Sequence, residues 1–386
     1  MTPGPLDGVR VVELGVVIAG PAAAAILADW GADVVMVEPR KGDPQRGNTE
    51  PAYFGLDNRG KRSVALDLKT PEGRDVVLAL IERADVVVTN LRSSALERLG
   101  LDWATISARF PRLVYAAITG YGTGDPDRPG YDMGAFWSRA GTALALTPKG
   151  GEPPFQRPGM GDHITAVNAA AGICAALLAR SRTGTGQLVS TSLLRAGTYV
   201  IGSDLAVLAR GGRPGTRARR FMGNPLLGSY RAGDDRWFWL LGVQSGRHWP
   251  SVARAIGRPD LADDPRYADP GQLVANRRAA MELLDEAFSA RPLAEWEAVF
   301  AREDVWYERV QSPEEALADP VLAAAGAFRD TEDGGRTVAT PVDFSTIQAG
   351  PAPRAPEAGE HTEEVLLELG WTWADMSGLK DRGVIP

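Results

Sequence analysis

One carboxylate in this sequence stands at the predicted start of a buried helix. Asp162 follows Gly161 and precedes an Ala- and Leu-rich run, residues 166–179, which leads into two arginines and a glycine-containing segment, residues 183–187. This composition predicts a buried helix whose positive end lies at Asp162. An Asp at that end accepts hydrogen bonds from free backbone N–H groups and stays ionised, so Asp162 is either a helix cap alone or a reactive carboxylate.

Other residue types that carry chemistry are sparse. The three histidines, His163, His248 and His361, lack the spacing of metal ligands, so we expect no metal site. The single cysteine, Cys174, has no internal disulfide partner and lies within the apolar run, which favours a core residue over a nucleophile. The sequence contains no G-x-S-x-G motif, which argues against a thioesterase of the α/β-hydrolase type.

Length and charge limit the class of protein further. A chain of 386 residues predicts two or more domains, and its net charge of −7 argues against nucleic acid as a partner. The sequence shows neither a secretory signal pattern nor an uncharged run of about 18 apolar residues. We therefore expect a cytoplasmic protein with no membrane span.

The elements that position Asp162 alternate between strand and helix. Residues 9–14 and 33–38 read as strands, and the helix between them begins near Pro21 and ends before Gly31, so the two strands should be parallel. Further strands are predicted at residues 63–66, 85–89 and 113–118, with helices between them. The alternation predicts an α/β fold with an open parallel sheet and helices on both faces.

Ligands of such sheets lie outside the carboxyl ends of the strands, where several cations of this sequence stand. They are either a solvated surface or the binding groups of a phosphate-bearing ligand. The first turn lacks G-x-G-x-x-G, which lowers the case for a dinucleotide. The cations of this half are Arg40, Lys41, Arg46, Lys69, Arg92 and Arg98.

The region from about residue 223 to residue 322 lacks the strand–helix alternation of the preceding part of the chain. Residues 229–232 and 236–243 are predicted to form an antiparallel hairpin, and helical segments follow, which indicates a smaller α+β domain. Two aromatic clusters, residues 136–137 and 237–239, either pack in cores or line an apolar acyl site.

Taken together and in order, the motifs resemble the class III CoA-transferases, the family of formyl-CoA, carnitine and bile-acid CoA-transferases that also includes the α-methylacyl-CoA racemases. The resemblance covers nearly the whole chain. It rests on segments 6–14, 19–21, 27–39, 42–43, 58–63, 66–73, 84–90, 130–132, 161–162, 183–187 and 359–365.

The resemblance implies a Rossmann-like large domain made from both ends of the chain and a smaller domain between them. Residues 1–200 would form the first part of the large CoA-binding domain, residues 201–325 the smaller α+β domain with its linkers, and residues 326–386 a return segment that completes the large domain. It also implies an interlocked homodimer, a form in which folded monomers need not exist alone.

The resemblance further assigns residues to the site. Asp162 takes the position of the catalytic carboxylate, with Gly161, Tyr131 and Asp132 in support. Around residues 220–225 only Gly223 remains of the family's flexible glycine run. The residues placed at CoA are Val17, Ile18, Ala19, Arg40, Arg46, Leu66, Lys69, Asn90, Leu91 and Arg98.

The activity this implies is transfer of CoA from an acyl-CoA to a free carboxylic acid through an aspartyl anhydride and an aspartyl-CoA thioester, with no cofactor other than CoA itself. The alternative is an acyl-CoA isomerase, either a racemase or an enzyme of intramolecular CoA transfer. Racemases of the family carry a histidine where this chain has Tyr131, and a phenol is a poor base at neutral pH, which favours transfer. His163 is either a replacement base or a surface or supporting residue, and Asp132 is either a supporting residue or part of a turn.

Overall fold

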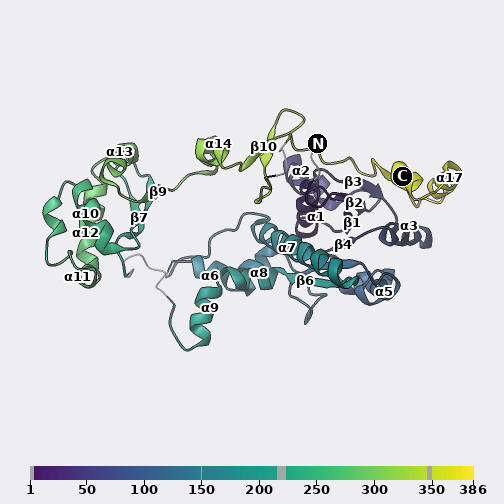
Figure 1. Ribbon diagram of the computed structural model, residues 1–386, viewed down its shortest axis with the longest axis horizontal. Helices are drawn as coiled ribbons and strands as arrows, with labels where there is room; N and C mark the ends of the chain where they lie inside the picture. Colours follow the sequence, from purple (N-terminus) through teal and green to yellow (C-terminus); the bar gives the residue numbers. More distant parts are fainter. Residues whose placement is uncertain (1–3, 149, 215–222, 346–349) are drawn as a thin grey trace. The chain divides into compact units, whose positions relative to one another are not determined.

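The computed structural model describes residues 4–148, 150–214, 223–345 and 350–386 (Figure 1). The chain divides into two compact units. The large unit comprises Met1–Leu144, Pro154–Gly202 and Val321–Pro386, and the small unit comprises Ala145–Pro153 and Ser203–Pro320. Each unit has its own sheet and its own hydrophobic core.

A six-stranded parallel sheet forms the centre of the large unit, in the order β3-β2-β1-β4-β5-β6. Its Val-rich strands are buried on both faces, as expected when helices cover both sides of a parallel sheet. The strand order reverses between β1 and β4, which makes this the switch point where open α/β sheets bind ligands. The strands are β1 Arg10–Leu14, β2 Asp33–Glu38, β3 Arg62–Ala65, β4 Val86–Thr89, β5 Val114–Thr119 and β6 Leu188–Ser192.

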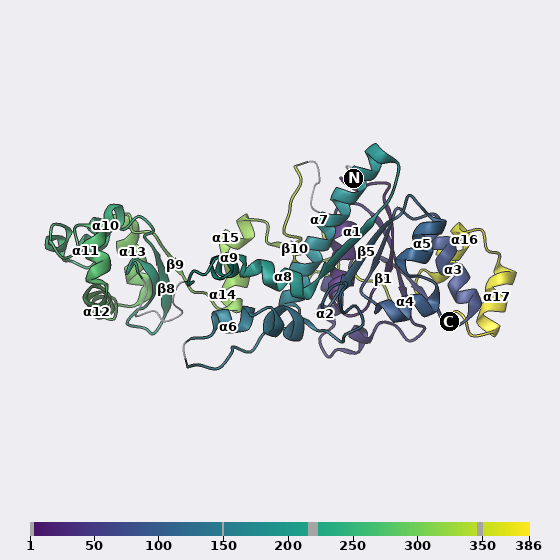
Figure 2. The ribbon, with the colours of Figure 1, turned by 90° about the horizontal axis from the view of Figure 1, so that it is seen from below.

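Two helices, α1 (Ala19–Asp29) and α7 (Met160–Thr183), cover one face of this sheet (Figure 2). Alternate strand residues such as Val11, Val34 and Val88 point to this face and pack against the alanines of both helices. By length and composition α7 could span a membrane, but core helices meet the same criteria, and 33% of its apolar stretch is buried within the chain.

The intervening strand residues point to the opposite face, which the C-terminal segment helps to cover. Val12 and Val35 pack in a core that includes side chains from the last two helices. This segment also bonds to the sheet edge, since the backbone N–H of Ala65 donates to Thr362 Oγ1 at 3.1 Å. The helices on this face are α3 Pro71–Glu82, α4 Ser93–Leu99, α5 Trp103–Arg109, α16 Thr362–Glu368 and α17 Trp373–Asp381.

Shorter elements connect these layers or lie where the chain passes between the units. They are the 3₁₀ helix η1 Pro44–Gly47, α2 Pro51–Asn58, the π-helical segment η2 Met133–Arg139, α6 Thr142–Leu146, α8 Leu193–Val200, α15 Pro320–Ala324, β10 Phe328–Asp330 and β11 Arg336–Val338.

The small unit is built on an antiparallel sheet of order β7-β8-β9. Phe238 and Leu240 of β8 are buried in its core, whereas Trp237 and Trp239 are exposed on the opposite face of the strand. The elements are α9 Gly202–Ala209, β7 Leu227–Arg231, β8 Trp237–Leu241, α10 Ser245–Ala255, η4 Pro259–Ala262, α11 Pro270–Ala275, α12 Arg277–Phe288, α13 Leu293–Glu303, β9 Tyr307–Arg309 and α14 Pro313–Ala318.

The structure confirms the predicted α/β fold and its parallel sheet. It also confirms the antiparallel hairpin, in which Ser229 pairs with Trp239. β6 is not predicted from sequence, because Leu-Val-Ser-Thr-Ser has the polar composition of a loop. β9 is not predicted either, because it is only three residues long and is defined by its pairing with β8.

A buried ion pair lies beneath the carboxyl end of β1. Lys61 Nζ donates to Glu13 Oε2 at 2.7 Å, to Asn58 Oδ1 at 2.8 Å and to the carbonyl oxygen of Pro21 at 2.9 Å. Burial raises the pKa of Glu13 and lowers the pKa of Lys61, and their mutual attraction opposes both shifts. Lys61 therefore links β1, α1 and α2, and each buried charge of the pair needs the other to offset its loss of hydration.

Lys61→Met is expected to lower the free energy of unfolding by about 3–5 kcal/mol, because it leaves a buried carboxylate without its partner. Urea unfolding followed by circular dichroism measures the change. The exposed Lys41→Met serves as the matched control and should change stability by less than about 0.5 kcal/mol. The double variant Glu13→Gln/Lys61→Met should recover part of the loss, and a single-variant cost below 1 kcal/mol would contradict the assigned role.

Candidate active site

A cavity of about 460 Å³ lies at the switch point of the large sheet. Its walls come from the segments that follow β1, β4 and β5, together with the start of α7. The residues that line it are Val16, Val17, Ile18, Ala19, Asn90, Leu91, Arg92, Ala95, Arg98, Ile118, Thr119, Gly120, Pro126, Arg128, Pro129, Gly130, Tyr131, Asp162 and Leu193.

The turn after β1 forms one wall and is held in a strained conformation. Val17 has a φ of 68°, in the left-handed region that a β-branched residue rarely adopts. Asn90 bonds both backbone groups of Val16, accepting from its N–H at 2.9 Å and donating to its carbonyl at 2.8 Å. Asp43 Oδ2 accepts the N–H of Val17 at 3.1 Å. These bonds offset a strain of about 1–3 kcal/mol and fix the wall in place.

Positive charge gathers around this cavity. Ile18 and Ala19 present the start of α1, where free N–H groups and the helix dipole favour anions. Arg92 and Arg98 contribute exposed guanidinium groups from the start and end of α4. Arg128 lies over the Tyr121 ring at 4.3 Å and lines the same cavity. The arrangement suits a ligand that carries several negative charges.

Asp162 is the carboxylate of this cavity, and it lies in the first turn of α7. The helix begins earlier than the sequence indicates, because Gly159 adopts a φ of 81° and takes the cap position itself. The expectation that helix capping keeps Asp162 ionised is wrong, since the cap residue of α7 is Gly159 and not Asp162. Burial, together with the charges of Asp132 and Asp57, raises the pKa of Asp162 to about 7, and the charge of His163 opposes this rise.

Asp132 and Gly161 bring α7 and η2 together next to Asp162. The N–H of Gly161 donates to Asp132 Oδ2 at 3.2 Å, and Asp132 is buried. A Cβ atom at position 161 would lie 2.6 Å from Cγ of Phe136 and 2.9 Å from Cβ of Asp132, so only glycine permits this approach. Tyr131 lines the cavity with 71% of its surface exposed.

His163 is held away from the cavity by a residue that the sequence does not single out. Its Nε2 lies 2.9 Å from Oδ1 of Asp57, whose side chain is 3% exposed at the end of α2. Burial acts against the charged imidazole, but the bond to Asp57 and the charges of Asp57, Asp162 and Asp132 outweigh it and raise the pKa of His163. The supporting position predicted for His163 fits this geometry better than a base facing substrate.

The residues predicted to contact CoA fall into two groups along the carboxyl edge of the sheet. Val17, Ile18, Ala19, Asn90, Leu91 and Arg98 line the cavity. Arg40 and Lys69 are exposed near the ends of β2 and β3, and Leu66 is buried there. Arg46 forms an ion pair with the buried Glu38 at 2.8 Å. For this second group CoA contact stays a prediction.

Several cavity residues are missing from the predicted set. Arg128, Pro129 and Gly130 belong to the turn-rich loop before Tyr131, where the family motif begins at Gly130 and gives no reason to choose the residues that precede it. Arg92 appears in the sequence only as one of several cations at strand ends. Of the segment 220–225, residues 220–222 lie outside the described part of the chain, so the replacement of the glycine run is not assessed.

The first aromatic cluster is buried, and the second contains both buried and exposed side chains. Phe136 and Trp137 pack with Leu193 in a core cluster of the large unit, as core packing predicts. Phe238 belongs to the core of the small unit, and its neighbours Trp237 and Trp239 are exposed. Within the described residues, no group of His, Cys, Asp and Glu side chains is arranged to hold a metal ion.

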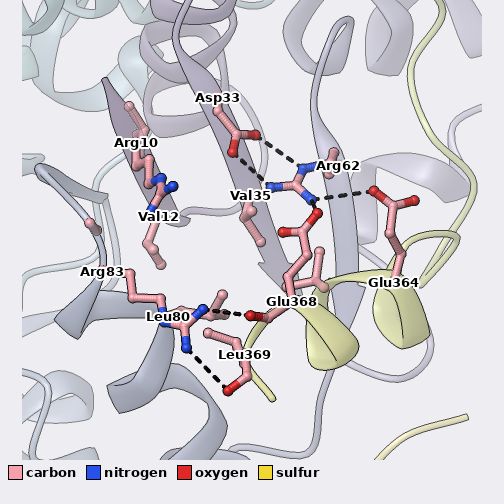
Figure 3. Close-up of a pocket in the computed structure, with 13 residues that line it drawn as sticks. Arg10, Val12, Asp33, Val35, Arg62, Leu80, Arg83, Glu364, Glu368 and Leu369 are labelled. Atoms are coloured by element: carbon pink, nitrogen blue, oxygen red, sulfur yellow. Dashed lines mark hydrogen bonds and ion pairs between the residues drawn. The ribbon is translucent and has the colours of Figure 1, made fainter. Parts of the chain in front are cut away.

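A second cavity, of about 630 Å³, lies at the opposite edge of the same sheet, where the strands begin (Figure 3). Its charges largely satisfy one another. Arg62 forms ion pairs with Asp33 at 2.7 Å and with Glu368 at 2.8 Å, and Arg83 donates to the carbonyl oxygen of Glu368 at 2.5 Å. The cavity at the switch point is therefore the better candidate for an anionic substrate.

Comparisons with known proteins agree with this geometry. A model of CoA-transferase family III matches residues 6–362. The chain is 34% identical to (R)-2-hydroxy-4-methylpentanoate CoA-transferase of Clostridioides difficile, over 98% of this chain and 99% of that protein. It is 31% identical to cinnamoyl-CoA:phenyllactate CoA-transferase of Clostridium sporogenes, over 98% and 97%. A solved CaiB/BaiF family protein from Brucella suis superposes with a TM-score of 0.82 and 32% identity, over 95% of this chain and 100% of that one.

The chain therefore belongs to CoA-transferase family III, and the resemblance seen in its motifs is confirmed. It is a CoA-transferase, an enzyme that transfers CoA between an acyl-CoA and a carboxylic acid.

Asp162→Asn is expected to stabilise the fold more at pH 8 than at pH 5. The pKa of Asp162 rises from its ordinary 3.8 to about 7 on folding, so the folded chain favours the protonated carboxyl group. That contribution is complete below about pH 4 and is lost as the pH rises through 7. Asparagine has no such loss, so its advantage in free energy of unfolding should grow by about 2–3 kcal/mol between pH 5 and pH 8. Urea unfolding at both pH values measures it, and an equal difference at both would contradict the raised pKa.

Proposed function

We propose that this enzyme transfers CoA by covalent catalysis on Asp162. The observation that carries the proposal is the position of this carboxylate in the switch-point cavity, beside the start of α1 and the arginines of α4. A pKa of about 7 leaves a large share of the carboxyl groups ionised at neutral pH, and the ionised group is less stabilised than a surface aspartate.

The steps balance without a cofactor other than CoA. An Asp162 carboxylate oxygen attacks the acyl carbon of the donor, the C–S bond breaks, and a mixed anhydride and the CoA thiolate form. The thiolate attacks Cγ of Asp162 and releases the donor carboxylate, leaving an aspartyl-CoA thioester. The acceptor carboxylate attacks this thioester and expels the thiolate again. The thiolate then attacks the acceptor acyl carbon, which gives the new acyl-CoA and regenerates Asp162.

The cavity residues support this proposal, and the relatives suggest which substrates to test. The negative phosphates of CoA suit the arginines of the cavity and the positive end of α1. The relatives named for 2-hydroxy-4-methylpentanoate and for phenyllactate suggest 2-hydroxycarboxylic acids as acceptors to be tested first.

Isomerisation by exchange of the α-proton requires a second base opposite Asp162. Among the residues that the structure describes, the cavity is lined by Tyr131 and by no histidine, and a phenol is in general a poorer base than an imidazole. His163 is engaged by Asp57 and does not line the cavity. Transfer is therefore the activity that these residues support best.

Asp162→Asn is expected to abolish covalent trapping and to lower the transfer rate by at least about 1,000-fold, because the amide is not a nucleophile. The enzyme is incubated with cinnamoyl-CoA, or with other acyl-CoAs of a donor panel, then quenched with hydroxylamine or borohydride, and peptides are mapped by mass spectrometry. The wild type should carry the modification at Asp162.

The matched control for this experiment is Asp204→Asn, an exposed aspartate of α9. It should trap and transfer as the wild type does. A modification on another residue, or uptake of solvent deuterium at the acyl α-carbon without any acceptor acid, would contradict the proposal.

We further propose that the enzyme works as an interlocked homodimer in the cytoplasm. Support comes from two adjacent apolar side chains that the single chain leaves uncovered on α8 of the large unit, Tyr199 and Val200, with Tyr199 85% exposed. Exposed apolar side chains that lie together are typical of a protein interface.

Tyr199→Glu is expected to shift the protein from dimer toward monomer or aggregate, because it places a charge in a desolvated interface. Size-exclusion chromatography with light scattering measures the mass. Trp373→Glu on α17 is the control and should leave the mass unchanged. A monomeric wild type, or a dimer that tolerates Tyr199→Glu fully, would contradict this assignment.

A further inference from the structure

The imidazole of His163 is fixed beside the nucleophile by contacts on several sides. Its Nε2 bonds with Asp57 at 2.9 Å, and its backbone N–H donates to the carbonyl oxygen of Gly159 at 2.8 Å. A Cβ atom at Gly159 would lie 3.1 Å from Cε1 of the ring and 3.3 Å from Cδ1 of Ile18. The His163 ring and the cavity residue Ile18 therefore both pack closely against Gly159. The ring therefore has little freedom, although 40% of the side chain is exposed.

Asp57 is buried in the last turn of α2, a helix that packs against α1. Its other carboxylate oxygen lies 3.5 Å from Nε2 of Gln45. Its neighbour Asn58 bonds to the buried Lys61. The partner of the imidazole is therefore anchored by the same elements that hold the first turn of the cavity.

The charges around this imidazole are mostly negative. Asp162 and Asp132 act on it from α7 and from the segment beside η2, and Asp57 acts on it from α2. Lys61 and Asp43 are the charged groups whose interactions extend this cluster behind Asp57. Among the described residues, His163 is the group whose charge lowers the pKa of Asp162. An ionised nucleophile in this cluster needs a nearby cation, and the imidazole is placed to supply it.

We propose that Asp57 and His163 form a positioning pair, in which Asp57 holds a protonated imidazole beside Asp162 and so keeps the nucleophilic carboxylate ionised. This inference rests on the proposed covalent role of Asp162. His163 does not act on substrate, because it does not line the cavity and its Nε2 is bonded to Asp57. His163 acts through the positive charge it presents to Asp162, and the charge of Asp57 opposes part of this effect.

His163→Asn removes the cation and retains a polar side chain. Without it the pKa of Asp162 should rise, so the acid limb of the kcat/KM profile should move to higher pH by about one unit. At pH 6 the variant should then be up to about tenfold slower than the wild type, and above pH 9 the two should agree within about twofold. A merely structural role predicts an equal loss at every pH, and that result would overturn the proposal.

The assay uses the donor and acceptor that react fastest in the panel described above. His361→Asn is the matched control: this histidine accepts the N–H of Ser63 at 3.2 Å, on the side of the sheet edge where α16 packs, and an asparagine oxygen can replace its Nδ1. Its pH profile should coincide with that of the wild type. A control that shifts as His163→Asn does would also overturn the proposal.

A second measurement does not depend on activity. With ¹³Cε1-labelled histidine, NMR follows the three imidazoles of the full protein as the pH changes, and His163→Asn identifies the resonance of His163. Its titration midpoint should lie above the usual value of about 6.5 in the wild type. It should fall by about one unit in Asp57→Asn, which keeps the shape of the partner and removes its charge.

The two measurements separate failure of the inference from failure of the proposed function. A wild-type midpoint at or below about 6.5, or a midpoint unchanged in Asp57→Asn, overturns the pair whatever the enzyme does. A wild type that forms no adduct on Asp162 overturns the covalent mechanism, while the titration still reports whether the pair exists.

Discussion

The contact between α7 and η2 at Gly161 is the constraint on which the site depends. The glycine lets the helix start approach Phe136 and Asp132 at distances that no side chain would permit. The next residue, Asp162, is thereby delivered to the cavity and brought close to a second buried carboxylate. The same approach therefore sets the position of the Asp162 carboxylate and the electrostatic environment that disfavours its ionised form.

Burial of Asp162 opposes its ionisation, whereas positive groups from several elements favour it. Water is partly removed from Asp162, which raises its pKa and makes the carboxylate more reactive once it is ionised. The arginines of α4 and Arg128 line the cavity where the phosphates of a substrate would bind. In the proposed pair, the imidazole held by Asp57 supplies positive charge from a residue that does not line the cavity. Arginines in the cavity and this imidazole would then act on Asp162 in different roles.

Much of this arrangement is predictable from sequence, because strand and helix patterns depend on local composition. The Val-rich strands, the proline and glycine that bound α1, and the Ala-rich helix α7 are all read correctly. The pairing of Asp57 with His163 joins positions 106 residues apart and has no local signal. The helix start at Gly159 also escapes prediction, since Asp162 looks like a cap in sequence and only the backbone shows otherwise. Tertiary contacts, rather than propensities, decide both points.

The C-terminal segment that covers the second face of the sheet has a consequence for biosynthesis. As the polypeptide leaves the ribosome, Val12 and Val35 emerge early, and the helices that bury part of their face are translated some three hundred residues later. Until then the nascent sheet leaves apolar surface exposed to solvent, and its closing contacts carry a large loop-closure entropy. A topology closed so late in synthesis favours slow folding.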